Sequence, residues 1–199
     1  MVFTLLILLL LLAGCTGTAP QAEPATPRTE IPTPQATTLP PTVPPSTFPD
    51  ALPLKTVTEI GEGTNLREIS VYKYLIRDKY EFYSSEWGRW EPVSAPPGKA
   101  FLIIFVRVKH IGTVKENSAP YPSVINIHFD DNIYSYKSGR DPLIPINDVR
   151  ELEYTGGKLY VHETKEGFII YEVPEGIRPY DTYLTIFVPE GTAPVWKLA

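Results

Sequence analysis

The stretch FLIIFVRVKHI, residues 101–111, decides the fold class of this chain of 199 residues. Its first half is apolar at every position, whereas its second half alternates between apolar residues such as Val106 and charged residues such as Arg107. A continuous apolar run is typical of a strand buried on both faces, and alternation is typical of a strand with one exposed face. The stretch therefore predicts a long strand that is central in a sheet at one end and half-exposed at the other.

Two later stretches end in the same turn. GFIIYEVPEG (167–176) and YLTIFVPEG (183–191) both run into Val-Pro-Glu-Gly. Proline removes a backbone donor and glycine lets the chain reverse, so both stretches are predicted to be strands that stop at a turn. Shorter candidates are 69–76, 124–129, 133–136, 159–161 and 195–198, and no stretch has a helical period of useful length. About seven or eight strands separated by Pro, Gly and Asp turns predict a single all-β sandwich.

The order of these motifs resembles a family of immunoglobulin-like domains of unknown function, found on secreted proteins and lipoproteins of archaea and bacteria. The residues that carry the resemblance are PPGKAFLIIFVRVKHIGT (96–113), DDNIYSY (130–136), the stretch 167–176 and the closing VWKL (195–198). His110-Ile111-Gly112 stands where the family usually has Asn-x-Gly, and Tyr171 stands in place of a Phe. The resemblance implies an immunoglobulin-like antiparallel β-sandwich and an extracytoplasmic location. It implies no activity and no catalytic residue.

The first residues of the chain predict export. Residues 2–13 are apolar except for Thr4, which is shorter than the roughly 20 residues needed to span a bilayer but suits a secretory signal. The segment Leu-Ala-Gly-Cys that follows, ending at Cys15, resembles the lipobox of prokaryotic lipoproteins and implies a signal peptide (1–14) and a lipid on the Cys15 thiol. No Lys or Arg precedes the apolar run, so either the true start lies upstream of Met1 or a neutral leader is tolerated. The alternative is an uncut signal anchor in which Cys15 is incidental.

Residues 15–54 are predicted to be a disordered stalk. Residues 16–54 contain 11 Pro and 9 Thr, and Phe48 is their only aromatic residue. Such a composition cannot bury enough apolar surface to offset the entropy of ordering. A Pro-rich chain extends by about 3.1 Å per residue, so the stalk would reach on the order of 100 Å. Thr and Ser beside Pro also fit an O-glycosylated stalk.

Residues 55–199 have ordinary globular composition and the usual size of one domain. Their 17 basic and 20 acidic residues form no basic run, which argues against nucleic-acid binding. The segment has no Cys, so no disulfide supports it, and it has no Met or Gln. Depletion of thermolabile residues is a trend in proteins of hot environments, so a thermophilic archaeal source is a hypothesis here.

The stretch EWGRW (86–90) is the candidate binding segment, because exposed Trp87, Arg89 and Trp90 would suit a protein or glycan contact. In the alternative interpretation these rings cap the open end of the sandwich. Three histidines, His110, His128 and His162, fall on predicted strands but share no metal-binding spacing, so the sequence assigns no metal site. Asp130-Asp131-Asn132 could offer oxygen ligands to Ca²⁺. The position of this segment between two predicted strands favours a hairpin turn instead.

No Gly-x-Ser-x-Gly, His-Glu-x-x-His or phosphate-binding loop occurs, so an enzyme is not predicted. No cofactor is predicted either. The sequence favours an exported lipoprotein, anchored to the outer face of the cytoplasmic membrane through Cys15, whose sandwich is a non-catalytic module that binds another protein of the cell envelope. The alternative is a glycan or small-ligand binder that uses exposed aromatics, and metal binding is a third hypothesis.

Overall fold

The computed structural model describes residues 48–136, 145–188 and 193–199. Cys15, the signal segment and most of the predicted stalk lie outside these ranges. No helix in the described ranges is long and apolar enough to cross a membrane. The strands are β1 (Leu52–Pro53), β2 (Val57–Ile60), β3 (Arg67–Arg77), β4 (Lys79–Ser84), β5 (Arg89–Ser94), β6 (Lys99–His110), β7 (Glu116–Ala119), β8 (Ile125–Phe129), β9 (Asn132–Ser135), β10 (Gly157–Tyr160), β11 (Thr164–Pro174), β12 (Tyr183–Ile186) and β13 (Val195–Lys197). Three 3₁₀ helices, η1 (Gly63–Asn65), η2 (Pro122–Val124) and η3 (Pro179–Asp181), join them.

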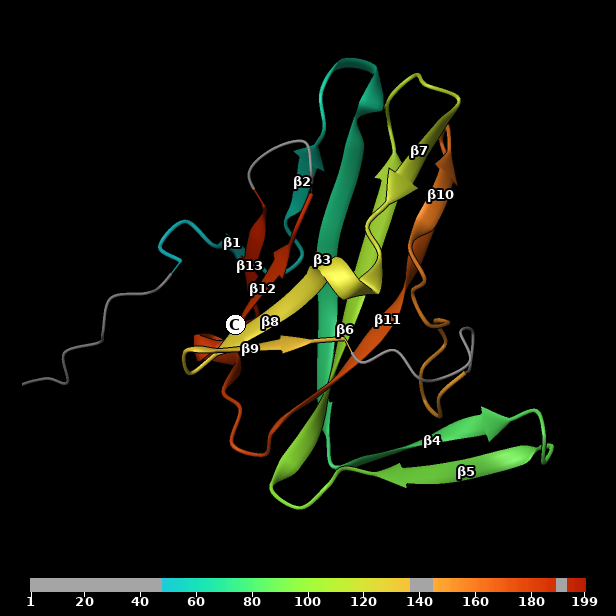
Figure 1. Ribbon diagram of the computed structural model, residues 1–199, viewed down its shortest axis with the longest axis vertical. Coiled ribbons are helices and arrows are strands. Elements are labelled where there is room, and N and C mark those ends of the chain that lie inside the picture. The colour runs from blue at the N-terminus through green and yellow to red at the C-terminus, as the bar shows by residue number, and fades with distance from the viewer. Residues whose placement is uncertain (1–47, 137–144, 189–192) are drawn as a thin grey trace, which may run out of the picture. The chain divides into compact units, whose positions relative to one another are not determined.

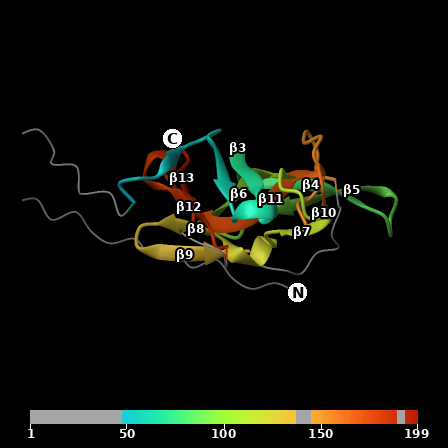
Figure 2. The same ribbon diagram turned by 90° about the horizontal axis from the view of Figure 1, so that it is seen from above.

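Two sheets pack against each other as a sandwich (Figures 1 and 2). One has five strands in the order β1-β13-β12-β8-β9, and the other has four in the order β11-β6-β3-β2. Two-stranded sheets, β7 with β10 and β4 with β5, complete the fold. All pairs are antiparallel except β1 with β13. The predicted all-β sandwich is therefore confirmed, with more and shorter strands than expected.

Strand β6 contains residues 101–110 of the stretch FLIIFVRVKHI, and its two faces are buried by different partners. Its even-numbered residues from Ala100 to Val108 lie in the main core between the two sheets. The odd-numbered Phe101, Ile103 and Phe105 lie in a second cluster on the opposite face of the four-stranded sheet. From Arg107 onward the odd-numbered side chains are exposed. The prediction of a strand buried on both faces at one end and half-exposed at the other is confirmed.

The second cluster is covered by segments distant in the sequence. Tyr80, Phe82 and Val93 come from the β4–β5 hairpin, and Ile146 and Val149 come from the loop that precedes β10. Because apolar area removed from water stabilises the fold by roughly 25 cal/mol per Å², this cover also fixes the hairpin to the sheet. In Figure 1 the hairpin runs sideways from the point where β3 ends and β6 begins.

The Tyr171 hydroxyl links the two sheets. Tyr171 is fully buried in β11 and donates a hydrogen bond of 2.9 Å to the carbonyl oxygen of Ile125, where β8 begins. Burial raises the pKa of this hydroxyl well above its ordinary value, so it stays protonated as a donor. The bond satisfies both polar groups inside an apolar core, where an unpaired group would be costly.

The folded segment begins before residue 55, where the composition changes. Leu52 and Pro53 form β1, which pairs with β13. The Phe48 ring lies 5.2 Å, centroid to centroid, from the rings of both His128 and Tyr183. The boundary predicted after Leu54 therefore falls inside ordered chain, because the few apolar side chains of the Pro-rich segment find partners on the five-stranded sheet.

Candidate functional site

The β4–β5 hairpin has an inner face that packs on the sandwich and an outer face that does not. Alternation places Tyr80 and Phe82 on the inner face and Tyr83 on the outer one. Tyr80 is only 3% exposed, and its ring makes an edge contact with the Phe101 ring at 4.9 Å. The inner face therefore anchors the hairpin, and the outer face is left for other contacts.

Backbone bonds from a later loop hold β4 on its second edge. The N–H of Tyr83 donates to the carbonyl of Pro145 at 3.1 Å, and the N–H of Asn147 donates to the carbonyl of Glu81 at 2.8 Å. The Asn147 side-chain amide also donates to the Glu81 carboxylate at 3.0 Å. Strand β4 is thus bonded on both sides, so the hairpin is an ordered platform.

We call Tyr83, Trp87 and Trp90 the aromatic face of the hairpin. The Tyr83 and Trp90 rings, paired across the strands, lie 5.6 Å apart at 73°, an edge-to-face contact. Trp87 sits in the turn, where its N–H donates to the Ser84 hydroxyl at 3.3 Å. The exposed fractions are 39% for Tyr83, 62% for Trp87 and 45% for Trp90. Such exposed rings are the side chains that most often dominate protein and ligand contacts.

Arg89 lies at the start of β5 beside the aromatic face. Its side chain is 72% exposed and its guanidinium lies 3.3 Å from the Glu91 carboxylate. An exposed pair of this kind contributes little to stability. It leaves the guanidinium able to stack or donate hydrogen bonds to a partner.

The exposed side chains expected at Trp87, Arg89 and Trp90 are observed, and part of the stretch is a strand. Glu86, Trp87 and Gly88 lie in a turn, whereas Arg89 and Trp90 are the first residues of β5. The interpretation that these rings cap the open end of the sandwich is wrong, because both Trp rings are exposed to solvent. Tyr83 was not singled out, although the alternation of apolar residues in KYEFYS (79–84) places it on the other face from Tyr80.

His110, which the pattern placed on a half-exposed strand, is fully buried. Its Nδ1 accepts the Gly112 N–H at 3.1 Å, so its Nε2 carries the proton and donates to the carbonyl of Val114 at 2.9 Å. Both ring nitrogens are therefore occupied by the backbone of the following loop.

The three histidines do not form a common site. His162 lies in a turn with a positive φ of 65°, and His128 lies on β8 with its Nε2 2.9 Å from the Thr185 hydroxyl. Within the described ranges, no three His, Cys, Asp or Glu side chains are placed so that they could hold a metal ion. Asp130 and Asp131, at φ 51° and 57°, form the two-residue turn between β8 and β9. Positive φ at both positions is typical of a tight hairpin turn, which confirms the hairpin reading of Asp-Asp-Asn.

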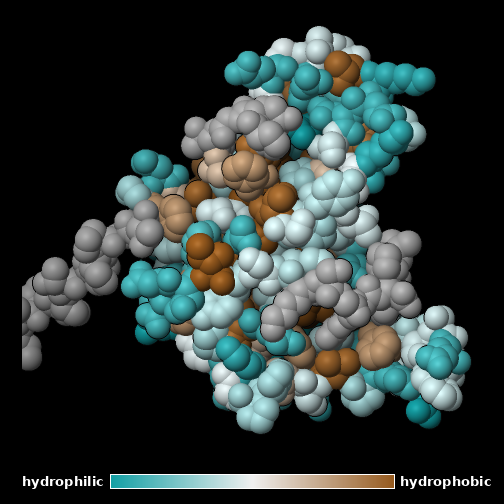
Figure 3. All heavy atoms as spheres, viewed as in Figure 1, coloured by the Kyte–Doolittle hydropathy of each residue, from teal (hydrophilic) through white to brown (hydrophobic). Residues whose placement is uncertain are grey.

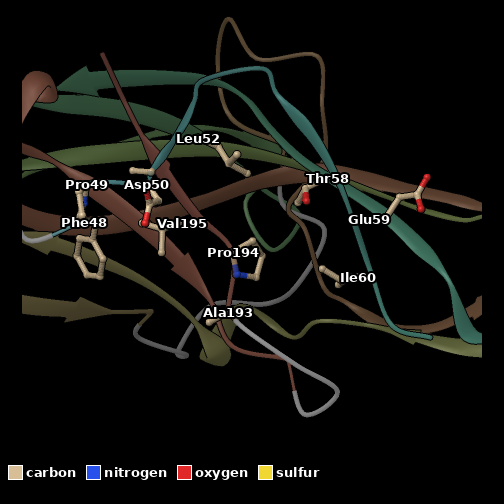
Figure 4. Close-up of a pocket in the computed structure, with 11 residues that line it drawn as sticks. Phe48, Pro49, Asp50, Leu52, Thr58, Glu59, Ile60, Ala193, Pro194 and Val195 are labelled. Atoms are coloured by element: carbon tan, nitrogen blue, oxygen red, sulfur yellow. The ribbon is translucent and has the colours of Figure 1, made fainter.

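A pocket of about 420 Å³ lies where the N-terminal segment meets β2 and the chain before β13. Its lining includes Phe48, Asp50, Glu59 and Pro194. Figure 4 shows Asp50 and Glu59 at opposite sides of the lining residues, so the two carboxylates do not converge on one point.

The exposed end of the four-stranded sheet forms a charged hollow of about 490 Å³. Its walls include Glu68, Arg107, Lys109 and Glu166, and the Arg107 Nε lies 2.6 Å from the Glu166 carboxylate. Figure 3 shows hydrophobic surface on the displayed face broken into patches among hydrophilic side chains. Alternating charges of this kind are typical of a solvated sheet face, so the aromatic face remains the better candidate site.

We expect the stability of the domain to fall at acidic pH, partly through His128. Burial lowers the pKa of His128 below 6.5, so the fold favours the neutral ring. The contribution is complete above the unfolded pKa, and it is lost as the pH falls below about 6.5 because the unfolded chain takes up the proton first. Urea unfolding at pH 7.5 and 5.0 should show a smaller loss in His128→Gln than in the parent. An equal loss in both proteins would contradict this role.

No protein-family model and no curated protein matches the chain. Among solved structures, the secreted protein MPT63 of Mycobacterium tuberculosis is similar at 14% identity and a TM-score of 0.47, over 76% of this chain and 99% of that one. An uncharacterized β-sandwich protein of Clostridium difficile 630 is similar at 16% identity and a TM-score of 0.44, over 80% and 99%.

The proposed lipoprotein ycdA of Bacillus subtilis is similar at 15% identity and a TM-score of 0.40, over 71% of this chain. The match covers only 38% of the ycdA chain. Likenesses this distant assign neither an activity nor a partner to this chain.

Proposed function

We propose that this chain is an exported lipoprotein, anchored through Cys15 to the outer face of the cytoplasmic membrane. Its β-sandwich is a non-catalytic module that binds another protein of the cell envelope through the aromatic face of the β4–β5 hairpin. The observation that carries the proposal is the set of three exposed rings, Tyr83, Trp87 and Trp90, on a hairpin whose opposite face is buried.

The anchored hairpin supports protein binding for an energetic reason. Association costs free energy for every side chain and loop that must be ordered in the complex. Here the Tyr83–Trp90 contact and the bonds from Pro145 and Asn147 have already ordered the platform. More of the gain from burying the rings is then available as affinity.

The predicted stalk also fits a partner close to the membrane. A tether of on the order of 100 Å converts binding to a membrane-bound partner into a local event with a raised effective concentration. In the described hairpin, no nucleophilic side chain is bonded to a general base. The opposite charges of Arg89 and Glu91 offset each other. A binding role therefore accounts for the site better than a catalytic one.

The double variant Trp87→Ala/Trp90→Ala should lose partner binding while the domain stays folded. Removing two aromatic contacts from the centre of an interface is expected to weaken binding at least about 100-fold. A photoreactive residue at position 86, beside Trp87, in intact cells should cross-link one reproducible envelope protein, and that product should disappear when Trp90 is changed to Ala. The mass of the mature N-terminus in the same extract reports whether Cys15 carries lipid.

Tyr180→Ala is the matched control, because Tyr180 is 56% exposed in η3 and belongs to no part of the hairpin. Cross-linking should be unchanged in this variant. Equal loss in the hairpin variant and in Tyr180→Ala, or a hairpin variant that binds normally, would remove the hairpin from the interface. An unmodified Cys15 in the mature protein would contradict the anchor.

One observation favours a glycan as the second candidate ligand. The Glu81 carboxylate and the Asn147 amide, which bond to each other at 3.0 Å, lie beside Tyr83 on the outer side of the same strand. Aromatic rings next to such polar groups can stack on a sugar and bond to its hydroxyls. Calorimetric titration of the full chain with envelope glycans separates the two candidates, since Glu81→Gln should weaken glycan binding and leave the protein cross-link intact.

A further inference from the structure

Strand β9 is the last strand of the five-stranded sheet. In the described ranges no strand is hydrogen-bonded to its outer edge, although β11 of the other sheet lies close to it. Figure 2 shows it at the rim of the molecule, beyond β8. The side chains of Asn132, Ile133 and Ser135 are exposed, Ile133 by 63%. An edge strand with free backbone groups is a template for pairing with another strand.

The hydrogen-bond pattern shows which groups of β9 are free. Phe187 donates its N–H to the carbonyl of Val124 at 2.9 Å, so the even-numbered residues of β8 bond to β12. The odd-numbered residues of β8 therefore bond to β9, where their register partners are even-numbered. The N–H and C=O groups of Ile133 and Ser135 consequently point away from the sheet. No backbone hydrogen bond to these groups occurs in the part of the chain that the structure describes.

The free edge of the hairpin strand β5 differs. Ala95 donates to the carbonyl of Asp78 at 2.7 Å, so odd-numbered residues of β5 bond to β4 and even-numbered ones point outward. One of these is Pro92, which has no N–H to offer. Proline and charged side chains are the means by which proteins protect an edge from pairing. Strand β9, Asn132–Ser135, contains neither.

We propose that β9 pairs with β9 of a second copy of this chain, antiparallel and related by a two-fold axis through Tyr134. In this register Ile133 lies opposite Ser135 of the second copy, and Ser135 lies opposite Ile133. These are the two residues whose backbone groups point outward, so each facing pair exchanges two N–H···O bonds. The two five-stranded sheets become one continuous sheet.

The side chains of β9 favour a second copy as the occupant. The strand carries no charge, so two identical strands meet without repulsion between like charges. The two Tyr134 residues face each other in a non-hydrogen-bonded pair, where side chains approach most closely and aromatic pairs are favourable. Ile133, which is exposed in one copy, is covered by the strand of the other. The interface is closed and isologous, so it yields a dimer and not a fibre.

Sedimentation velocity of the full-length chain in a mild non-ionic detergent, from about 1 to 100 μM, tests the proposal, together with hydrogen exchange of single amides. The dimer should form at the upper end of this range, which is the affinity expected of a small interface. The amides of Ile133 and Ser135 should exchange slowly in the dimer and rapidly after dilution. Ser135→Pro removes an outward N–H that β8 does not use, and each copy then loses a bond. Dimerisation should therefore weaken about 30-fold.

Ser135→Ala is the matched control. It removes the bond of 2.8 Å from the Ser135 hydroxyl to the Asn126 amide oxygen but keeps the backbone N–H, so it should stay dimeric.

A monomer at 100 μM with rapid exchange of both amides would overturn the proposal. So would a dimer that Ser135→Pro leaves intact, or protection that appears only when another envelope protein is added. Hydrogen exchange of the parent chain still tests the pairing of β9 even if Ser135→Pro does not fold. Trp87→Ala/Trp90→Ala should leave the dimer unchanged, which keeps this test separate from that of the aromatic face.

Discussion

Gly112→Ala is expected to destabilise the domain by at least about 3 kcal/mol. A Cβ at this position would overlap the Thr64 carbonyl oxygen and would lie 2.8 Å from the Leu66 nitrogen. The backbone has little room to yield, because the Gly112 N–H already donates to the Leu66 carbonyl at 2.9 Å. Relief of the overlap would break that bond and the contact with His110 together. The midpoint of guanidinium unfolding, followed by circular dichroism, measures the effect.

Gly176→Ala provides the comparison for this prediction. A Cβ at Gly176 would meet no heavy atom within 4 Å in the described structure. The substitution should therefore change the free energy of unfolding by no more than about 0.5 kcal/mol. Similar midpoints for the Gly112 and Gly176 variants would show that the loop after β6 can move away from residues 64–66, and that the close approach is not required by the fold.

The sandwich could be predicted because its longer strands show local patterns of apolar and polar residues. The run that begins at Phe101 showed a strand with two apolar faces, and Leu184, Ile186 and Val188 lie in the main core as their alternation indicated. The order of residues along one strand decides which face each side chain occupies. Such information is local, so a single sequence contains it.

The hairpin and the second cluster could not be predicted in the same way. The apolar outer face of β6 required a cover, but nothing local shows that Ile146 and Val149, some forty residues later in the chain, supply it. Nor does the sequence show that Trp90 is exposed whereas Trp196 is fully buried. Both are Trp residues on short strands with at least one charged neighbour, and tertiary packing distinguishes them.

Trp196→Ala should destabilise the domain by about 3–5 kcal/mol, the cost of removing a large buried ring. Trp196 has no exposed surface and pairs with Leu52 in β1 and with Leu184 in β12. Its indole N–H donates to the carbonyl of Thr56 at 3.0 Å, so the variant also leaves a carbonyl group without its partner. Far-UV circular dichroism should follow the unfolding, because the substitution itself changes the fluorescence.

Trp90→Ala is the control for Trp196→Ala. Trp90 is 45% exposed and makes an edge-to-face contact with the Tyr83 ring, so its loss should cost about 1 kcal/mol or less. A large loss in Trp196→Ala with a small one in Trp90→Ala assigns one ring to the core and leaves the other available for recognition. Equal losses would mean that the hairpin rings support the fold. The aromatic face would then no longer be a reason to propose binding. Pairing through β9 would be unaffected, because β9 belongs to a different sheet from the hairpin.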